Sequence, residues 1–138
     1  MKYYRSLSLA LALCFAIVGI VFAAIPDDVL RFFNLLSPAF SLPPSPLTSY
    51  NFYLVLASAY MYLVTLLAFM MYRWPENRCY PMLLINAKLA SSFFSVIFFI
   101  AHARYLVYLA NFVVDAMIGM LVFLIYVKML KDGKWASS

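Results

Sequence analysis

Charged residues are scarce in this chain: Asp, Glu, Lys and Arg make up 11% of its 138 residues, and there are three glycines and two cysteines. A soluble domain has about 25% charged residues, so a water-soluble globular fold is excluded. Two cysteines exclude a disulfide framework, and three glycines leave no glycine-rich phosphate loop. Disorder is excluded too, because disordered chains are poor in apolar residues and this chain is 67% hydrophobic.

The sequence also lacks the usual marks of catalysis. It has one histidine, no Cys/His cluster with metal-ligand spacing, no closely spaced carboxylates and no nucleophile elbow. We therefore expect a protein that is not an enzyme, with no cofactor and no metal. The net charge of +5 makes no continuous basic patch, because the cations lie at the ends of apolar runs, so nucleic acid is not expected as a partner.

Four apolar runs are present, each near the 20 residues that a helix needs to cross a bilayer. They cover residues 7–25, 52–72, 81–102 and 105–127. Their length and lack of ten-residue alternation favour helices over barrel strands. The short loops after the second and third runs predict antiparallel neighbours. The fold class is thus all-α: a single membrane domain, 1–138, built as a four-transmembrane-helix up-down bundle. The first run is longer than a signal-peptide core, so we expect it to stay uncleaved.

Loop charges predict the orientation. Arg31 and Arg104 lie on one side together with Asp27 and Asp28. The positive-inside rule then places both termini in the cytoplasm. The short chain without a retention signal favours the cytoplasmic (inner) membrane of a bacterium, and the alternative is a eukaryotic endomembrane. Cys14 and Cys79 differ in depth, so no disulfide is expected. The cations assigned to the inner side are Lys2, Arg5, Arg73, Arg78, Lys128, Lys131 and Lys134, and Trp74 and Trp135 lie there as interfacial anchors.

The external loop, 26–51, divides into two halves. Val29, Phe32, Phe33 and Leu36 recur at helical spacing in the first half, which predicts a short interfacial helix capped by Asp27 or Asp28. The second half, SPAFSLPPSPLTS, holds four prolines and predicts an irregular external strap. The strap either covers the mouth of the bundle or forms a lid over a lipid-accessible pocket.

A stripe of small residues follows one face of the first span. Small residues let helix backbones approach closely, so this stripe predicts helix packing within the bundle. The alternative is a docking face for another subunit. The stripe consists of Ser8, Ala12, Ala16, Gly19 and Ala23.

Polar residues in the third and fourth spans form the candidate site. Lys88 and Asp115 lie at nearly equal depth, with an axial offset of about 5 Å, although side chains lean toward the N-terminus of their helix, which tilts these two apart. Three interpretations remain: a structural ion pair whose remaining hydrogen bonds Asn111 and Ser92 satisfy, a Lys that snorkels to the headgroups beside a separately satisfied Asp, and a polar pocket for water or a ligand head. On the same two faces lie Ser91, Ser95, Tyr108 and Gly119.

His102 lies at the external end of the third span. We expect it to serve the helix C-terminus; the alternatives are capping a quinone or lipid pocket, or supplying half of a haem site shared with another subunit. Tyr60, in the middle of the second span, needs a hydrogen-bond partner for its phenol.

The overall plan resembles the small bacterial four-helix proteins of the DoxX-like type. The matching pieces are Arg5 at the start of the first span, the segment IPDDVLRFF at its end, and Lys88 and Asp115 on the tight third-to-fourth hairpin. The proline strap departs from that plan. Some members are linked to respiratory quinone-oxidising complexes, so the resemblance implies an accessory membrane subunit.

The leading functional hypothesis is a non-enzymatic accessory or assembly subunit of a membrane complex, with the lipid bilayer and other membrane subunits as its partners. A second is a binder or carrier of a quinone or lipid between the third and fourth spans, held by Lys88, Asp115, Asn111 and His102. A third is a small proton-coupled transporter that acts as a homodimer, with Asp115 as its proton site.

Overall fold

The computed structural model of the chain describes residues 2–47 and 52–133, and this part contains helices and no strand. Four of its helices are long and apolar enough to cross a membrane, which indicates a multi-pass membrane protein. The elements in chain order are α1 (Lys2–Ala24), α2 (Pro26–Leu36), the 3-10 helix η1 (Ser37–Phe40), α3 (Phe52–Arg73), α4 (Cys79–Ala101) and α5 (Leu106–Lys131).

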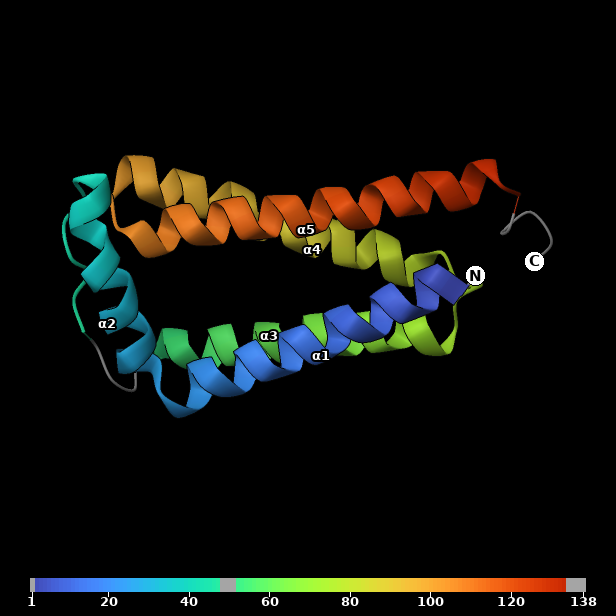
Figure 1. Cartoon of the computed structure of the whole chain (residues 1–138), viewed down its shortest axis with the longest axis horizontal. Coiled ribbons are helices and arrows are strands. Elements are labelled where there is room, and N and C mark those ends of the chain that lie inside the picture. Colours follow the sequence, from blue (N-terminus) through green and yellow to red (C-terminus); the bar gives the residue numbers. More distant parts are fainter. Residues whose placement is uncertain (1, 48–51, 134–138) are drawn as a thin grey trace.

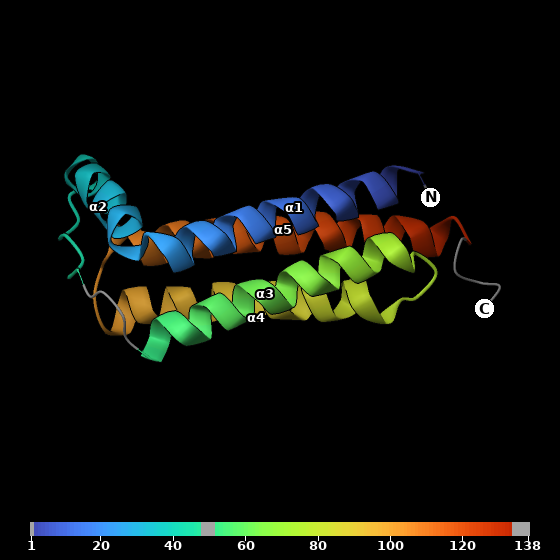
Figure 2. The same ribbon diagram turned by 90° about the horizontal axis from the view of Figure 1, so that it is seen from below.

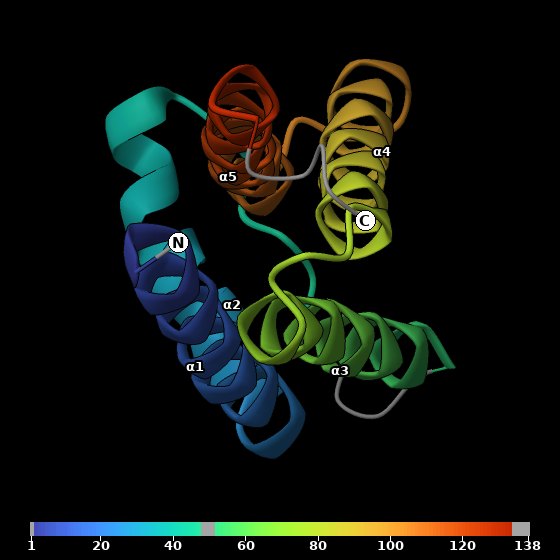
Figure 3. The same cartoon turned by 90° about the vertical axis from the view of Figure 1, so that its right-hand side faces the viewer.

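The four long helices form two closely packed pairs. Helix α1 packs mainly against α3, α4 packs mainly against α5, and a smaller contact between α3 and α4 joins the pairs. The start of α1, the α3–α4 loop and the end of α5 lie at one end of the bundle, and α2 crosses the other end (Figures 1 and 2). Viewed along the bundle, the long helices occupy four corners, with α1 and α4 on one diagonal (Figure 3).

Two spanning helices extend four or five residues beyond the apolar runs that predict them. Helix α1 begins at Lys2, five residues before the expected start, and α5 continues to Lys131, four residues past the expected end. The prediction counts apolar residues, whereas backbone hydrogen bonding continues into the headgroup region, where long basic side chains reach water. Lys134 and Trp135 lie outside the described residues.

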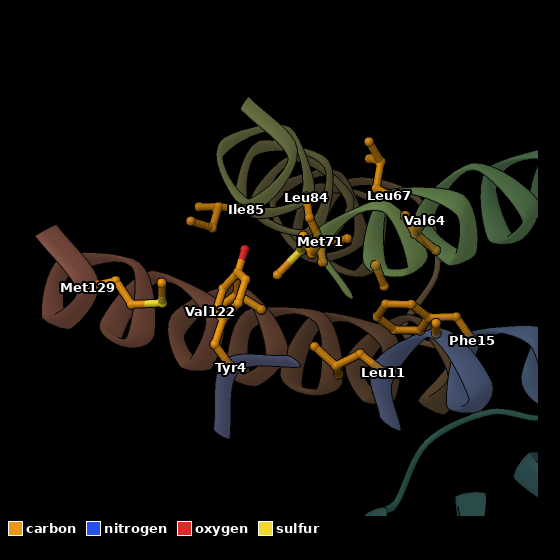
Figure 4. Packing of buried hydrophobic residues seen from close by; sticks show 12 residues of the cluster. Tyr4, Leu11, Phe15, Val64, Leu67, Met71, Leu84, Ile85, Val122 and Met129 are labelled. Carbon is orange, nitrogen blue, oxygen red and sulfur yellow. The ribbon is translucent and has the colours of Figure 1, made fainter. Parts of the chain in front are cut away.

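All four spanning helices contribute to one apolar core (Figure 4). Tyr4 and Phe15 come from α1 and Val122 from α5, and all three are almost fully buried. Large apolar side chains elsewhere on the helices, among them Ile20 and Leu124, are exposed. Such a surface is expected where the solvent is the hydrocarbon of the bilayer.

The small-residue stripe on α1 lies largely within the bundle. Ser8 and Ala12 are buried. At Gly19 a Cβ atom would lie 3.0 Å from the Cβ of Met61 on α3, so the two backbones approach closely there. Ala23, at the far end of the stripe, is exposed.

Helix α2 begins differently from the sequence prediction. The predicted cap by Asp27 or Asp28 is wrong: α2 begins at Pro26, directly after Ile25, and no side chain caps its N-terminus. Proline suits the first turn of a helix because it has no N–H to satisfy. The two aspartates lie within that turn, where the positive end of the helix dipole attracts their negative charges. The exposed Asp28–Arg31 pair (3.4 Å) adds little stability.

The strap is more regular than its prolines predict. Residues Ser37–Phe40 form the 3-10 helix η1, with the Ser37 hydroxyl donating to the Phe33 carbonyl. Ser45, which follows η1, makes three hydrogen bonds with the side-chain amide of Asn34 on α2, and we call this contact the Asn34–Ser45 clasp. Asn34 Nδ2 donates to the Ser45 carbonyl (2.8 Å), and Asn34 Oδ1 accepts from the Ser45 N–H (2.7 Å) and hydroxyl (3.0 Å).

Replacing Asn34 with alanine should release the strap. The substitution removes all three bonds, each worth about 0.5–1.5 kcal/mol, and leaves the Ser45 N–H without that acceptor. We expect faster hydrogen–deuterium exchange at Ser45, by about 10-fold or more, with the exchange of the spanning helices unchanged. Asn34→Asp is the matched control, because it keeps the accepting oxygen. Equal exchange at Ser45 in wild type and Asn34→Ala would contradict the clasp.

Candidate functional site

Lys88 of α4 and Asp115 of α5 lie against each other inside the bundle. The Lys88 Nζ is 2.8 Å from Asp115 Oδ1, and the two side chains are 3% and 4% exposed. Gly119, one turn beyond Asp115, keeps α5 close to α4. A Cβ there would lie 3.5 Å from the Cβ of Lys88 and 3.3 Å from Leu89 Cδ2. Neutralising each charge by the other reduces the cost of holding either one at membrane depth.

This contact resolves the geometry that the sequence left open. The lean of side chains toward each helix N-terminus tilts Lys88 and Asp115 in opposite directions, yet their charged atoms meet at hydrogen-bond distance. The four-carbon stem of lysine is long enough to cover the difference in depth. In this geometry Lys88 is almost completely buried, so it does not snorkel to the headgroups.

Two aromatic rings from the other helix pair face the same ammonium group. The Lys88 Nζ lies 4.5 Å from the centre of the Phe15 ring on α1 and 5.3 Å from that of Tyr60 on α3. Both distances suit cation–π attraction. The Tyr60 hydroxyl donates to the Ala87 carbonyl of α4 (3.0 Å), which satisfies the phenol. Residues from all four spanning helices therefore meet at Lys88.

A second polar cluster joins α4 to α5 closer to the α4–α5 turn. The Ser92 hydroxyl donates to the Phe112 carbonyl (3.0 Å). The Asn111 Nδ2 donates to Ser95 (2.7 Å) and to Ser91 (3.1 Å). Asn111 and Ser92 thus bond elsewhere, and the expectation that they complete the hydrogen bonds of the ion pair is wrong. Among the described residues, Asp115 Oδ2 is buried and has no hydrogen-bond partner.

His102 lies apart from this cluster, at the C-terminal end of α4. It is exposed, its backbone N–H donates to the Phe98 carbonyl, and its ring stacks on that of Phe98 (5.0 Å between centres). None of these contacts reaches Lys88 or Asp115. The polar residues on this face of α4 therefore form two groups. One group bonds to α5 inside the bundle, and His102 lies at the surface.

Phe15 is the component that sequence reasoning missed. The chain has 13 phenylalanines, and nothing in the local sequence distinguishes Phe15 from the others. Its place at Lys88 depends on how α1 packs against the remaining helices. Mid-span Tyr60, by contrast, carries a signal, because a phenol in hydrocarbon needs a partner.

The remaining candidate groups are separate from one another. Within residues 2–47 and 52–133, no group of three or more His, Cys, Asp or Glu side chains lies close enough to hold a metal ion. Cys14 and Cys79 are free thiols, and both are exposed.

In comparisons with known proteins, the chain matches no family model, no curated protein and no solved structure.

Proposed function

We propose that this protein is a non-enzymatic accessory or assembly subunit of a complex in the cytoplasmic membrane. One observation carries the proposal: the two intramembrane charges, Lys88 and Asp115, are buried against each other (2.8 Å). The neighbouring polar side chains bond across α4 and α5. Ionisable groups at membrane depth are the default candidates for chemistry or transport, and here they support the packing of the bundle.

The charges at the two ends of the bundle support the proposed orientation. Arg31 and Arg104 accompany Asp27 and Asp28 at the end crossed by α2, so this end has no excess of positive charge. Cytoplasmic loops carry the excess of Lys and Arg, which places the opposite end, with both termini, in the cytoplasm. The described cations at that opposite end are Lys2, Arg5, Arg73, Arg78, Lys128 and Lys131.

The partner surface in this proposal is formed by α2 and η1 at the outer end. Leu35 is 80% exposed, and Phe32 and Phe40 are about 60% exposed. The small-residue stripe is less suitable, because Ser8 and Ala12 are already buried. One residue separates α1 from α2, and in this proposal α2 lies in the interfacial region of the membrane. The Asn34–Ser45 clasp holds this surface in shape, which suits an integral membrane subunit packed beside it.

Site-specific photo-crosslinking tests this surface. A photoreactive amino acid at position 35 should give one discrete protein adduct in the native membrane. The matched control is position 124, which is also exposed but lies on a spanning helix and should give lipid adducts only. Lipid adducts alone at position 35, or the same protein adduct from both positions, would contradict the docking surface.

A second candidate, a proton-coupled transporter that acts as a dimer, rests on Asp115. Its Oδ2 is buried and accepts no hydrogen bond within the described part of the chain, so this oxygen is where a proton would be held. By contrast, hydrogen bonds join α4 directly to α5. Among the described residues, these contacts do not favour a quinone or lipid pocket between the two helices.

Proton flux distinguishes the second candidate from the first. In proteoliposomes that contain a pH-sensitive dye, a transporter should admit protons under an imposed potential, and Asp115→Asn should abolish that flux while the protein stays folded. Flux equal to that of protein-free liposomes would contradict the transporter and agree with the accessory subunit.

A further inference from the structure

The α3–α4 loop forms a shallow depression at the end of the bundle that carries most of the cations. Its lining residues are Trp74, Glu76, Asn77, Arg78 and Tyr80. The Trp74 and Tyr80 rings lie 6.2 Å apart, centre to centre. Asn77 Oδ1 accepts the Cys79 N–H (2.9 Å), which fixes the loop against the start of α4.

Positive charge gathers around this depression. Arg78 lines it and is exposed, and the Arg73 guanidinium lies 5.8 Å from the centre of the Trp74 ring. Arg5 reaches the same end of α3, where its Nε donates to the Tyr72 carbonyl (3.3 Å). Glu76 is the one acidic side chain among the lining residues. The local charge therefore favours an anion.

The depression also adjoins the lipid-facing surface of the bundle. Phe69 near the end of α3, and Met82 and Leu83 near the start of α4, are large apolar residues that are exposed. Tryptophan and tyrosine are typical of the boundary between hydrocarbon and headgroups. An occupant of this place would have a charged head at the arginines and an apolar body along α3 and α4.

We propose that this depression binds the headgroup of an anionic phospholipid, with Arg78 and Arg73 contacting the phosphate. Guanidinium groups bind phosphate oxygens through paired, charge-assisted hydrogen bonds. Basic pockets between spanning helices are known headgroup sites. The acyl chains lie along Phe69, Met82 and Leu83. The site does not depend on the subunit function proposed above.

Trp74 provides a direct reporter for this site. The chain has two tryptophans, so in the Trp135→Phe variant Trp74 is the single tryptophan. In nanodiscs, phosphatidylglycerol brominated high on its acyl chains should quench Trp74 more strongly than phosphatidylcholine brominated at the same positions. One basic residue near a charged surface is worth about 1 kcal/mol, so Arg78→Gln should lower the preference for phosphatidylglycerol about fivefold. Glu76→Gln should raise it.

Arg104→Gln is the matched control, because it removes the same charge at the other end of the bundle and should leave the preference unchanged. Equal quenching by the two lipids in the Trp135→Phe protein would overturn the proposal. So would an equal loss in Arg104→Gln and Arg78→Gln. Inorganic phosphate at millimolar concentration should not compete; if it removed the preference, the site would belong to a free anion instead of a lipid.

Discussion

Replacing Lys88 with methionine should lower the free energy of unfolding by about 3–5 kcal/mol, the typical cost of removing one partner from a buried ion pair. The substitution keeps most of the side-chain volume but leaves the buried Asp115 carboxylate without its only described hydrogen-bond donor. It also removes the cation that faces Phe15 and Tyr60. Unfolding in mixed micelles measures the free energy, and the amount of protein in the membrane should fall with it.

The double variant Lys88→Met with Asp115→Leu is the decisive companion to this measurement. Replacing both charges with apolar groups removes the unpaired charge that makes each single variant unstable, and such replacements are often neutral or stabilising. We therefore expect the single variant Asp115→Leu to destabilise as well, and the double variant to be clearly more stable than Lys88→Met. Additive losses in the double variant would show that the pair is not an energetic unit.

Replacing Gly19 with alanine should also be costly, by about 1–3 kcal/mol, the usual range for overpacking a close contact. The new Cβ would lie 3.0 Å from the Cβ of Met61. That atom is attached directly to the α3 backbone, so it moves away only if α1 and α3 separate. The intrinsic helix preference of alanine, about 1 kcal/mol, offsets only part of this cost.

Gly119→Ala is the matched control for Gly19→Ala. Its Cβ would lie 3.3 Å from Leu89 Cδ2, the end of a side chain that changes rotamer more easily. We expect a smaller loss of stability than for Gly19→Ala, measured in the same unfolding assay. A Gly19→Ala protein as stable as the wild type would contradict the close approach of α1 to α3.

The four spanning helices could be predicted from sequence because long apolar runs are a strong and local signal. Their ends could not, since Lys2 and Lys131 continue helices in a region where composition no longer distinguishes helix from loop. The predicted cap of α2 was wrong for a different reason. Two aspartates were present, but the helix begins at Pro26, which suits the first turn without a side-chain cap.

The candidate site was partly accessible to sequence reasoning. Lys88 and Asp115 stand out because charges are rare at membrane depth. Their direct contact depends on how far lysine reaches and how closely α4 and α5 pack, and helical spacing alone does not determine either. Phe15 and the Asn34–Ser45 clasp join residues whose proximity arises only in the folded chain.

Native mass spectrometry of the tagged full-length chain, released gently from its own membrane, tests the proposed role most directly. An accessory or assembly subunit should carry discrete additional protein masses at a fixed stoichiometry, and those masses would identify its neighbours. A bare monomer or dimer that retains one small molecule would contradict the account and point to a binder of lipophilic ligands instead.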